Sequence, residues 1–190
     1  MGIAGGRCGD ESASLKSGSF FLVEERSPDF TYEMFGEHVA NGKYGLVITR
    51  DFPPEVRRKH ALPACPTLWV TNLVGPDNIS PTSIGLLLSR VITFFEKNHP
   101  AVVVLDGVEH LISQNSFDRI MQFIHQLRDM VLVSGGTVIM PLDSRILEEK
   151  QLALLERNLE VIVPSPRLSG RKFVFELEDG MLKVMNENAR

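Results

Sequence analysis

The sequence contains no apolar run long enough to cross a membrane, and its first residues lack the apolar core of a signal peptide. Cysteine is also scarce, since the 190 residues include only Cys8 and Cys65, which lie in unrelated contexts. These two residues form neither a CxxC motif nor a disulfide framework. We therefore expect a protein of the reducing cytoplasm that makes no direct membrane contact.

Sequence patterns of common catalytic and metal sites are absent as well. The five histidines show neither HxxxH nor HExxH spacing, and together with two unrelated cysteines they do not predict a zinc site. No GxSxG motif is present to position a nucleophilic serine. We therefore expect no metal and no cofactor, and no residue stands out as catalytic.

Positive charge is low for a protein that binds nucleic acid. Lysine and arginine number 20 against 24 acidic residues, which gives a net charge of −4. This balance argues against broad nucleic-acid binding. The one basic cluster, Arg57-Arg58-Lys59-His60, lies on a short predicted helix and is typical of a solvated helix face.

The chain does contain a regular alternation of buried strands and amphipathic helices. Apolar runs predict strands at 20–23, 45–49, 67–71, 101–105, 137–140 and 160–163. Helical patterns and their start signals lie between the strands, beginning near residues 28, 53, 81, 117 and 144. This order predicts an α/β fold, a three-layer sandwich with a mostly parallel sheet of about six strands. We expect 20–23, 102–105 and 138–140 at the centre of the sheet.

The two ends of the chain follow different patterns. Residues 1–18 are rich in Gly, Ser and Ala and predict a flexible tail, which leaves 19–190 as a single domain. Near the C-terminus, Asp179-Gly180 favours a tight turn between two apolar segments. We therefore expect an antiparallel β-hairpin at 171–185, attached to the edge of the sheet.

The stretch from Ala101 to Leu105 organises the rest of the chain. It has no polar face, so the strand must be covered on both sides in the middle of a parallel sheet. Asp106 follows directly and lies at the carboxyl end of the strand, where ligands bind in open α/β sheets. P-loop ATPases hold Mg²⁺ with an aspartate in this position.

The phosphate-binding part of such an ATPase is missing. A P-loop requires GxxxxGK[ST] between the first strand and the first helix. If Thr31 takes the hydroxyl position, Glu24 and Asp29 replace the two glycines and Phe30 replaces the lysine. We expect the acidic groups of this segment to face the place of a triphosphate and to repel it. Pro28 also removes one N–H group that an anion would need.

Further charged residues follow the predicted strands at the same edge of the sheet. Our candidate ligand-binding residues there are Arg50, Asp106, Glu109, Asp143 and Arg145. A rim of mixed charge suits a small polar ligand or the loop of a partner protein. The alternative is an internal network, in which Arg50 and Arg145 pair with Asp51, Asp106 and Asp143 and hold the loops in place.

Several of these segments together resemble an archaeal family, the domain of unknown function numbered 835. The resemblance rests on the segments 45–50 and 105–112, on Trp69 and on Pro141-Leu142-Asp143, and it extends from about Ser19 to Val163. It implies a fold like that of RecA and the circadian-clock ATPases, with a degenerate phosphate loop. Members of the family often occur with sensory and membrane modules, which implies a role in archaeal signalling.

These observations lead to two main hypotheses for function. The first is a non-catalytic regulatory or protein-interaction module that keeps an ATPase scaffold, with residues 57–62 or the hairpin as contact surfaces. The second is a domain that binds a nucleotide or Mg-nucleotide with little or no hydrolysis. An enzyme of unrelated chemistry that uses the acidic rim is the third reading. ATP hydrolysis is not favoured, because P-loop ATPases often carry a catalytic glutamate directly after the aspartate and Gly107 follows Asp106 here. The sequence predicts a protein partner and leaves the oligomeric state open.

Overall fold

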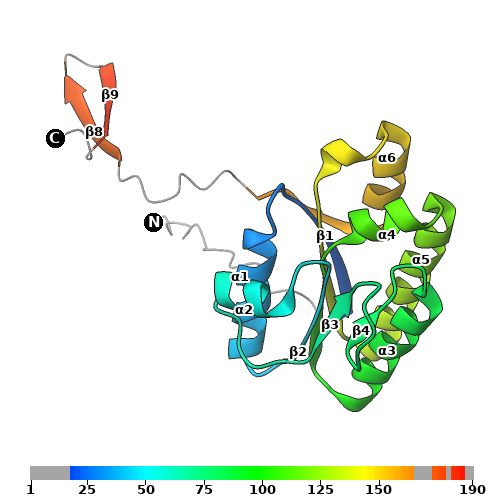
Figure 1. Cartoon of the computed structure of the whole chain (residues 1–190). Coiled ribbons are helices and arrows are strands. Elements are labelled where there is room, and N and C mark those ends of the chain that lie inside the picture. Colours follow the sequence, from blue (N-terminus) through cyan, green and yellow to red (C-terminus); the bar gives the residue numbers. More distant parts are fainter. Residues whose placement is uncertain (1–17, 165–172, 179–180, 187–190) are drawn as a thin grey trace, which may run out of the picture.

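The computed structural model describes residues 18–164, 173–178 and 181–186 (Figure 1). Its strands are β1 (Ser19–Glu24), β2 (Tyr44–Thr49), β3 (Thr67–Val70), β4 (Asn78–Ile79), β5 (Ala101–Leu105), β6 (Thr137–Leu142), β7 (Glu160–Ile162), β8 (Phe173–Glu178) and β9 (Met181–Asn186). Its helices are α1 (Asp29–Ala40), α2 (Pro53–Lys59), α3 (Ile84–Lys97), α4 (Val108–Gln114), α5 (Phe117–Ser134) and α6 (Glu149–Asn158), with a 3₁₀ turn, η1 (Ser144–Ile146). The predicted tail at 1–17 lies outside the described residues.

The main sheet contains seven strands in the order β4-β3-β2-β5-β6-β1-β7, and every neighbouring pair is parallel. The predicted α/β class and parallel sheet are confirmed. The additional strand is β4, whose two residues are too few for a recognisable sequence pattern. Of the three strands expected at the centre, β5 and β6 lie there. The expectation for β1 is wrong, because only β7 lies between it and the edge.

Helices cover both faces of this sheet, as Figure 1 shows. The helices α1 and α2 pack on one face, where Tyr32, Phe35 and Val56 join the apolar cluster of that side. The other four helices contribute to the cluster on the opposite face, through residues such as Leu87, Leu111, Ile124 and Leu155. The molecule therefore has the three layers expected from the sequence.

The two faces of β5 belong to different clusters. Val102 and Val104 contact the α1 side, whereas Ala101, Val103 and Leu105 contact the opposite side. All five side chains are at most 1% exposed. The apolar run thus occupies the environment that its composition requires, between two layers of helices.

The helix start signals are only partly correct. The segment 113–116 caps α5 as expected, but the capping residue is Ser116 and not the favoured Asn115, since the Ser116 hydroxyl accepts a hydrogen bond from the Arg119 amide at 3.3 Å. Ser27 does not cap α1, because its hydroxyl donates to the Asp29 carboxylate at 2.8 Å instead. The short helix α4 has no counterpart among the predicted elements, because it lacks the proline start signal that marks α2, which is equally short.

The C-terminal strands β8 and β9 pair with each other antiparallel, with Leu177 opposite Leu182 and Phe175 opposite Val184. They form a separate two-stranded sheet. The expectation that this hairpin extends the edge of the main sheet is therefore wrong. Its turn at 179–180 lies outside the described residues.

Gly45 provides a test of the packing between α1 and the sheet. A Cβ atom added at Gly45 would lie 2.6 Å from the Phe35 ring and 2.8 Å from Val39, both in α1. We expect Gly45→Ala to lower the free energy of unfolding by about 2 kcal/mol, because the buried ring has no space to move. Urea denaturation measures this change.

Gly36→Ala is the matched control, since a Cβ atom at Gly36 within α1 meets nothing within 4 Å. We expect this variant to be more stable than the wild type by about 0.5–1 kcal/mol, because alanine favours a helix. Equal stability of the two variants would contradict the predicted clash.

Candidate functional site

Two cavities lie at the carboxyl edge of the sheet, each between a pair of strands whose following helices cover opposite faces. The neighbours β2 and β5 lead into α2 on one face and α4 on the other. The neighbours β6 and β1 likewise lead into α6 and α1 on opposite faces. Such points are where open α/β sheets place their ligands.

The first cavity, which we call the Asp106 cavity, has a volume of about 190 Å³. Its lining comes from the start of α1, from the loop after β2 with α2, and from the end of β5. The lining residues are Pro28, Tyr32, Asp51, Glu55, Val56, Arg58, Lys59, His60 and Asp106. At this size the cavity is smaller than a typical site for a drug-sized ligand or a nucleotide.

Asp106 is held by two hydroxyl groups from neighbouring elements. The Tyr32 hydroxyl donates to Asp106 Oδ2 at 2.8 Å, and Thr49 Oγ1 lies 3.4 Å from the same oxygen. No described residue forms a hydrogen bond with the other carboxyl oxygen, Oδ1. The hydrogen bonds to Oδ2 therefore orient the carboxyl group, and Oδ1 remains available to accept a further hydrogen bond.

The Tyr32 ring is fixed in turn by stacking on His60, with ring centroids 4.2 Å apart and an interplanar angle of 24°. Tyr32 is only 2% exposed, so its hydroxyl is brought to Asp106 by the packing of α1 on the sheet. His60 also lies 3.6 Å from the Asp29 carboxylate through Nδ1. These contacts join α1, α2 and β5 around the cavity.

The electrostatics of the cavity disfavour a charged carboxylate at its base. The pKa of Asp106 is raised to about 6, mainly by burial and also by the nearby Asp51 and Glu109, while the hydrogen bonds from Tyr32 and Thr49 act in the opposite direction. Burial also lowers the pKa of His60, with Lys59 acting in the same direction. Burial and the adjacent Asp106 raise the pKa of the Tyr32 phenol, which stays protonated and donates its hydrogen bond.

The residue after Asp106 has a structural reason to be glycine. Gly107 begins α4 with φ +93°, a left-handed conformation that side chains rarely adopt. A Cβ atom there would lie 2.7 Å from the Arg50 Cβ atom. The catalytic glutamate that P-loop ATPases often carry directly after this aspartate is therefore disfavoured here by both backbone conformation and space.

The second cavity, which we call the Arg145 cavity, has a volume of about 590 Å³. It lies between the segments that follow β1 and β6 and is lined by Glu24, Glu25, Arg26, Asp143, Ser144, Arg145, Val163 and Pro164. Arg145 Nε donates to Asp143 Oδ1 at 2.8 Å, and a second hydrogen bond joins the other nitrogen and oxygen of the pair. These hydrogen bonds lower the pKa of Asp143 to about 2.

Glu25 has a role that the sequence did not indicate. Its two carboxylate oxygens accept hydrogen bonds from the backbone amides of Phe30 and Thr31, each at 3.0 Å. These amides belong to the first turn of α1, whose N–H groups have no partner inside the helix. Glu25 therefore caps the helix from outside, in the position where a bound anion would otherwise accept these hydrogen bonds.

The acidic residues of this segment do not all face one place, so that expectation is wrong. Asp29 turns toward α2, where it pairs with Lys59 at 3.4 Å. Burial raises the pKa of Glu24, and the approach of Glu156 raises it further. Only Glu25 occupies the start of α1, because only its side chain reaches back to the free amides.

The predicted rim residues divide between the two cavities. Asp106 lies in one, and Asp143 and Arg145 lie in the other. Glu109 connects them, since its Oε1 accepts a hydrogen bond from the Asp143 amide at 3.1 Å. Arg50 lines neither of these two cavities, and its backbone carbonyl accepts a hydrogen bond from the Trp69 indole at 3.0 Å.

The alternative of an internal ion-pair network is correct for one pair only. Arg145 binds Asp143, but among the described residues neither arginine of the predicted network pairs with Asp51 or Asp106. Asp106 is held by hydroxyl groups instead. The sequence missed Tyr32 and His60 because nothing in the local pattern shows that α1 and α2 bring their rings together.

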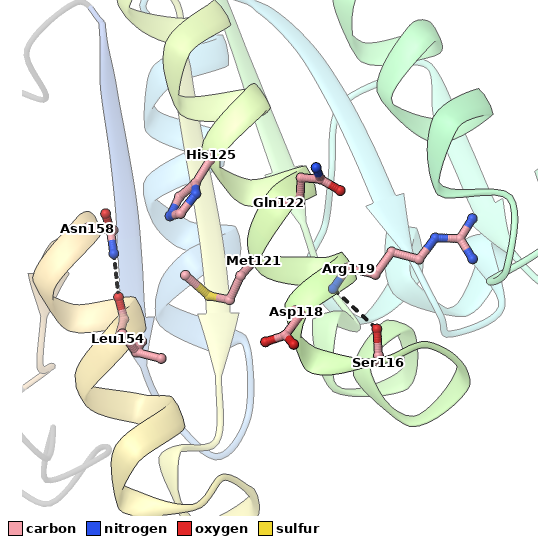
Figure 2. A pocket seen from close by; sticks show the side chains of 8 residues that line it. All are labelled: Ser116, Asp118, Arg119, Met121, Gln122, His125, Leu154 and Asn158. Carbon is pink, nitrogen blue, oxygen red and sulfur yellow. Dashed lines mark hydrogen bonds between the residues drawn. The ribbon is translucent and has the colours of Figure 1, made fainter.

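A third cavity, of about 580 Å³, lies between α5 and α6 (Figure 2). Figure 2 shows His125 and Met121 of α5 beside Leu154 and Asn158 of α6. None of the predicted site residues lines it. Across the described part of the chain, no cluster of three metal-binding side chains is found.

Residues 24–159 match the family described as "Protein of unknown function (DUF835)". The chain belongs to the DUF835 family. The match spans both cavities except for Val163 and Pro164, and it confirms the family that the sequence motifs indicated. No curated protein shows a significant match to the DUF835 chain. None of the described helices is both long and apolar enough to cross a membrane.

The raised pKa of Asp106 predicts a dependence of stability on pH. The folded protein binds the Asp106 proton more tightly than the unfolded chain does, because the pKa is about 6 in the fold and about 3.9 when unfolded. The contribution of Asp106 to stability is therefore full below about pH 4 and falls as the pH rises to about 6. We expect Asp106→Asn to be more stable than the wild type by about 2 kcal/mol at pH 8, with little gain at pH 4.

Urea denaturation at both pH values measures this difference. Asp77→Asn is the control, since Asp77 is exposed in the loop before β4. It should change stability little at either pH. An Asp106→Asn variant that is less stable than the wild type at both pH values would show that the carboxylate itself supports the fold.

Proposed function

We propose that this DUF835 domain is a non-catalytic regulatory or protein-interaction module built on a degenerate RecA-like ATPase scaffold. The observation that carries the proposal is the Glu25 carboxylate on the amides of Phe30 and Thr31. The start of α1 follows β1 directly, where a P-loop ATPase would bind the phosphates of its nucleotide. Here the protein places its own anion there.

The arrangement of the sheet supports this scaffold. β1 leads into α1, and β5 ends in Asp106, as the strand of an ATPase ends in its magnesium-binding aspartate. The start of α1 and Asp106 lie at the same carboxyl edge, because all seven strands are parallel. The resemblance to the DUF835 family implies the same scaffold and a place in archaeal signalling, and both are part of the proposal.

Phosphate binding at the start of α1 would have to displace Glu25. Two like charges 4 Å apart repel by about 1 kcal/mol in water, and more strongly where water is partly excluded. Pro28, which precedes the helix, has no N–H group to offer in compensation. Because Glu25 already caps α1, the start of this helix favours the nucleotide-free protein over the phosphate-bound protein.

The carboxyl edge then serves as a surface for a partner protein. It presents Arg26 and Arg145 beside Glu24 and Asp143, a pattern of both charges that gives selectivity to an interface. The basic cluster on α2 contributes less than its sequence suggests. Arg57 donates to the Cys65 carbonyl at 2.7 Å and does not line the Asp106 cavity, whereas Arg58 does.

A second candidate is a nucleotide-binding domain with little or no hydrolysis. The Arg145 cavity favours it, because about 590 Å³ lies in the range of small-molecule sites and two arginines line it. Ligand-dependent stability distinguishes the two candidates.

Thermal unfolding in the presence of ATP, GTP and cyclic dinucleotides, each with and without Mg²⁺, tests the proposal. We expect no rise in the melting temperature, because the anion position at α1 is already filled. A bound ligand at a hundred times its Kd would stabilise the fold by about 2.7 kcal/mol, which is readily measured. A rise that disappears in Arg145→Ala, which removes an arginine of the Arg145 cavity, would establish the second candidate instead.

A variant of Glu25 tests the cap itself. We expect Glu25→Ala to lower the free energy of unfolding by about 1–2 kcal/mol, because two first-turn amides lose their acceptor. Sulfate or phosphate should then restore part of this stability, since the freed amides form an anion site. The measurement is thermal unfolding in chloride and in sulfate at matched ionic strength.

Glu37→Ala is the matched control, because Glu37 is an exposed residue of the same helix and its removal changes the net charge equally. Its response to sulfate should equal that of the wild type. If Glu25→Ala and Glu37→Ala respond to sulfate alike, the start of α1 is not an anion position and the proposal loses its main support.

A further inference from the structure

A further cavity lies at the amino ends of the strands, opposite the carboxyl edge, and its lining differs in chemical character. It has a volume of about 610 Å³ and lies between α3 and α5, beside the residues that lead into β5 and β6. The apolar part of its lining consists of Ile92, Phe95, Met130 and Val133. None of the residues of the Asp106 or Arg145 cavity takes part in it.

The apolar lining continues onto the surface of α5. Val133, which lines the cavity, is 91% exposed. Phe95 at the base of the cavity is only 5% exposed. A Cβ atom at Gly136 would lie 1.9 Å from the Phe95 ring, so the ring lies directly on the backbone that leads into β6. The cavity therefore combines a fixed aromatic base with an exposed apolar rim.

Carboxylates are the main charged groups of this cavity. Glu96 of α3 and Asp129 of α5 line it together with His99 and Ser134, and neither a lysine nor an arginine does. Among the described residues, neither carboxylate makes a hydrogen bond or an ion pair. An occupant that supplies positive charge next to an apolar side chain would complement both properties.

We propose that the cavity between α3 and α5 docks a basic amphipathic helix of a partner protein. One bulky apolar side chain of that helix enters between Phe95, Met130 and Val133, and flanking lysines or arginines face Glu96 and Asp129. Docking of an amphipathic helix into a groove uses apolar anchors on one face with charges beside them. An exposed apolar patch next to a cavity is typical of such a surface.

A second copy of the chain fits this surface less well. In a symmetric dimer the same patch meets itself, so Glu96 and Asp129 of one copy would approach the same carboxylates of the other. Like charges across an interface are unfavourable. The surface therefore selects a partner of opposite charge.

The experiment uses a synthetic amphipathic helix of leucine and lysine as the probe and a leucine–glutamate helix of equal length as its counterpart. Isothermal titration calorimetry with the full chain should show binding of the lysine peptide and at least tenfold weaker binding of the glutamate peptide. Val133→Lys should weaken binding of the lysine peptide at least tenfold, because it removes an apolar contact and adds a like charge.

Val74→Lys is the matched control, since Val74 is fully exposed in the loop between β3 and β4 and the change in net charge is the same. It should bind the lysine peptide as the wild type does. The double variant Glu96→Gln, Asp129→Asn should also weaken binding and reduce its dependence on salt. Since Val133, Glu96 and Asp129 are all exposed, these variants should unfold at the temperature of the wild type.

Three results would overturn the inference. The first is no binding of the lysine peptide, and the second is equal weakening by Val133→Lys and Val74→Lys. The third is a concentration-dependent dimer in sedimentation that Val133→Lys abolishes, which would assign the surface to a second copy of the chain. The start of α1 takes no part in these measurements, so their failure leaves the nucleotide and Glu25 tests unaffected.

Discussion

The structure depends on the complete burial of β5 between two layers of helices. No residue of this strand is more than 1% exposed, so the sheet must be covered on both faces and must extend on both sides of β5. The same requirement leaves only the strand ends open to solvent. Asp106, directly after the last buried residue, lies where the apolar core meets the carboxyl edge, and its raised pKa is a consequence of that position.

The carboxyl groups at the carboxyl edge differ in whether all their oxygens have hydrogen-bond partners within the described protein. Glu25 accepts hydrogen bonds from the first turn of α1, and Asp143 is paired with Arg145. Asp106 keeps an oxygen without a described partner, although the surrounding burial disfavours its charge. Perturbed carboxyl groups in a cavity are typical of functional sites, which is why the Asp106 cavity stays part of the candidate site even without a phosphate loop.

The two edges of the sheet differ in what they offer to other molecules. The carboxyl edge presents side chains of both charges around its two cavities, whereas the cavity between α3 and α5 combines apolar side chains with two carboxylates and has neither a lysine nor an arginine in its lining. Parallel strands separate these surfaces, because every strand begins at one edge and ends at the other. A domain of this kind has room for two contacts that do not compete.

The sequence by itself determined the α/β class, the parallel sheet, the position of Asp106 at a strand end and the DUF835 family, because burial on both faces and strand–helix alternation leave a local pattern. It also placed Asp143 and Arg145 at the same edge. Only the tertiary structure decided that β6 separates β1 from β5, that Glu25 caps α1 and that Tyr32 and His60 meet at Asp106. These contacts join residues from different elements, and no periodicity within a single element records which side chains its neighbours will bring.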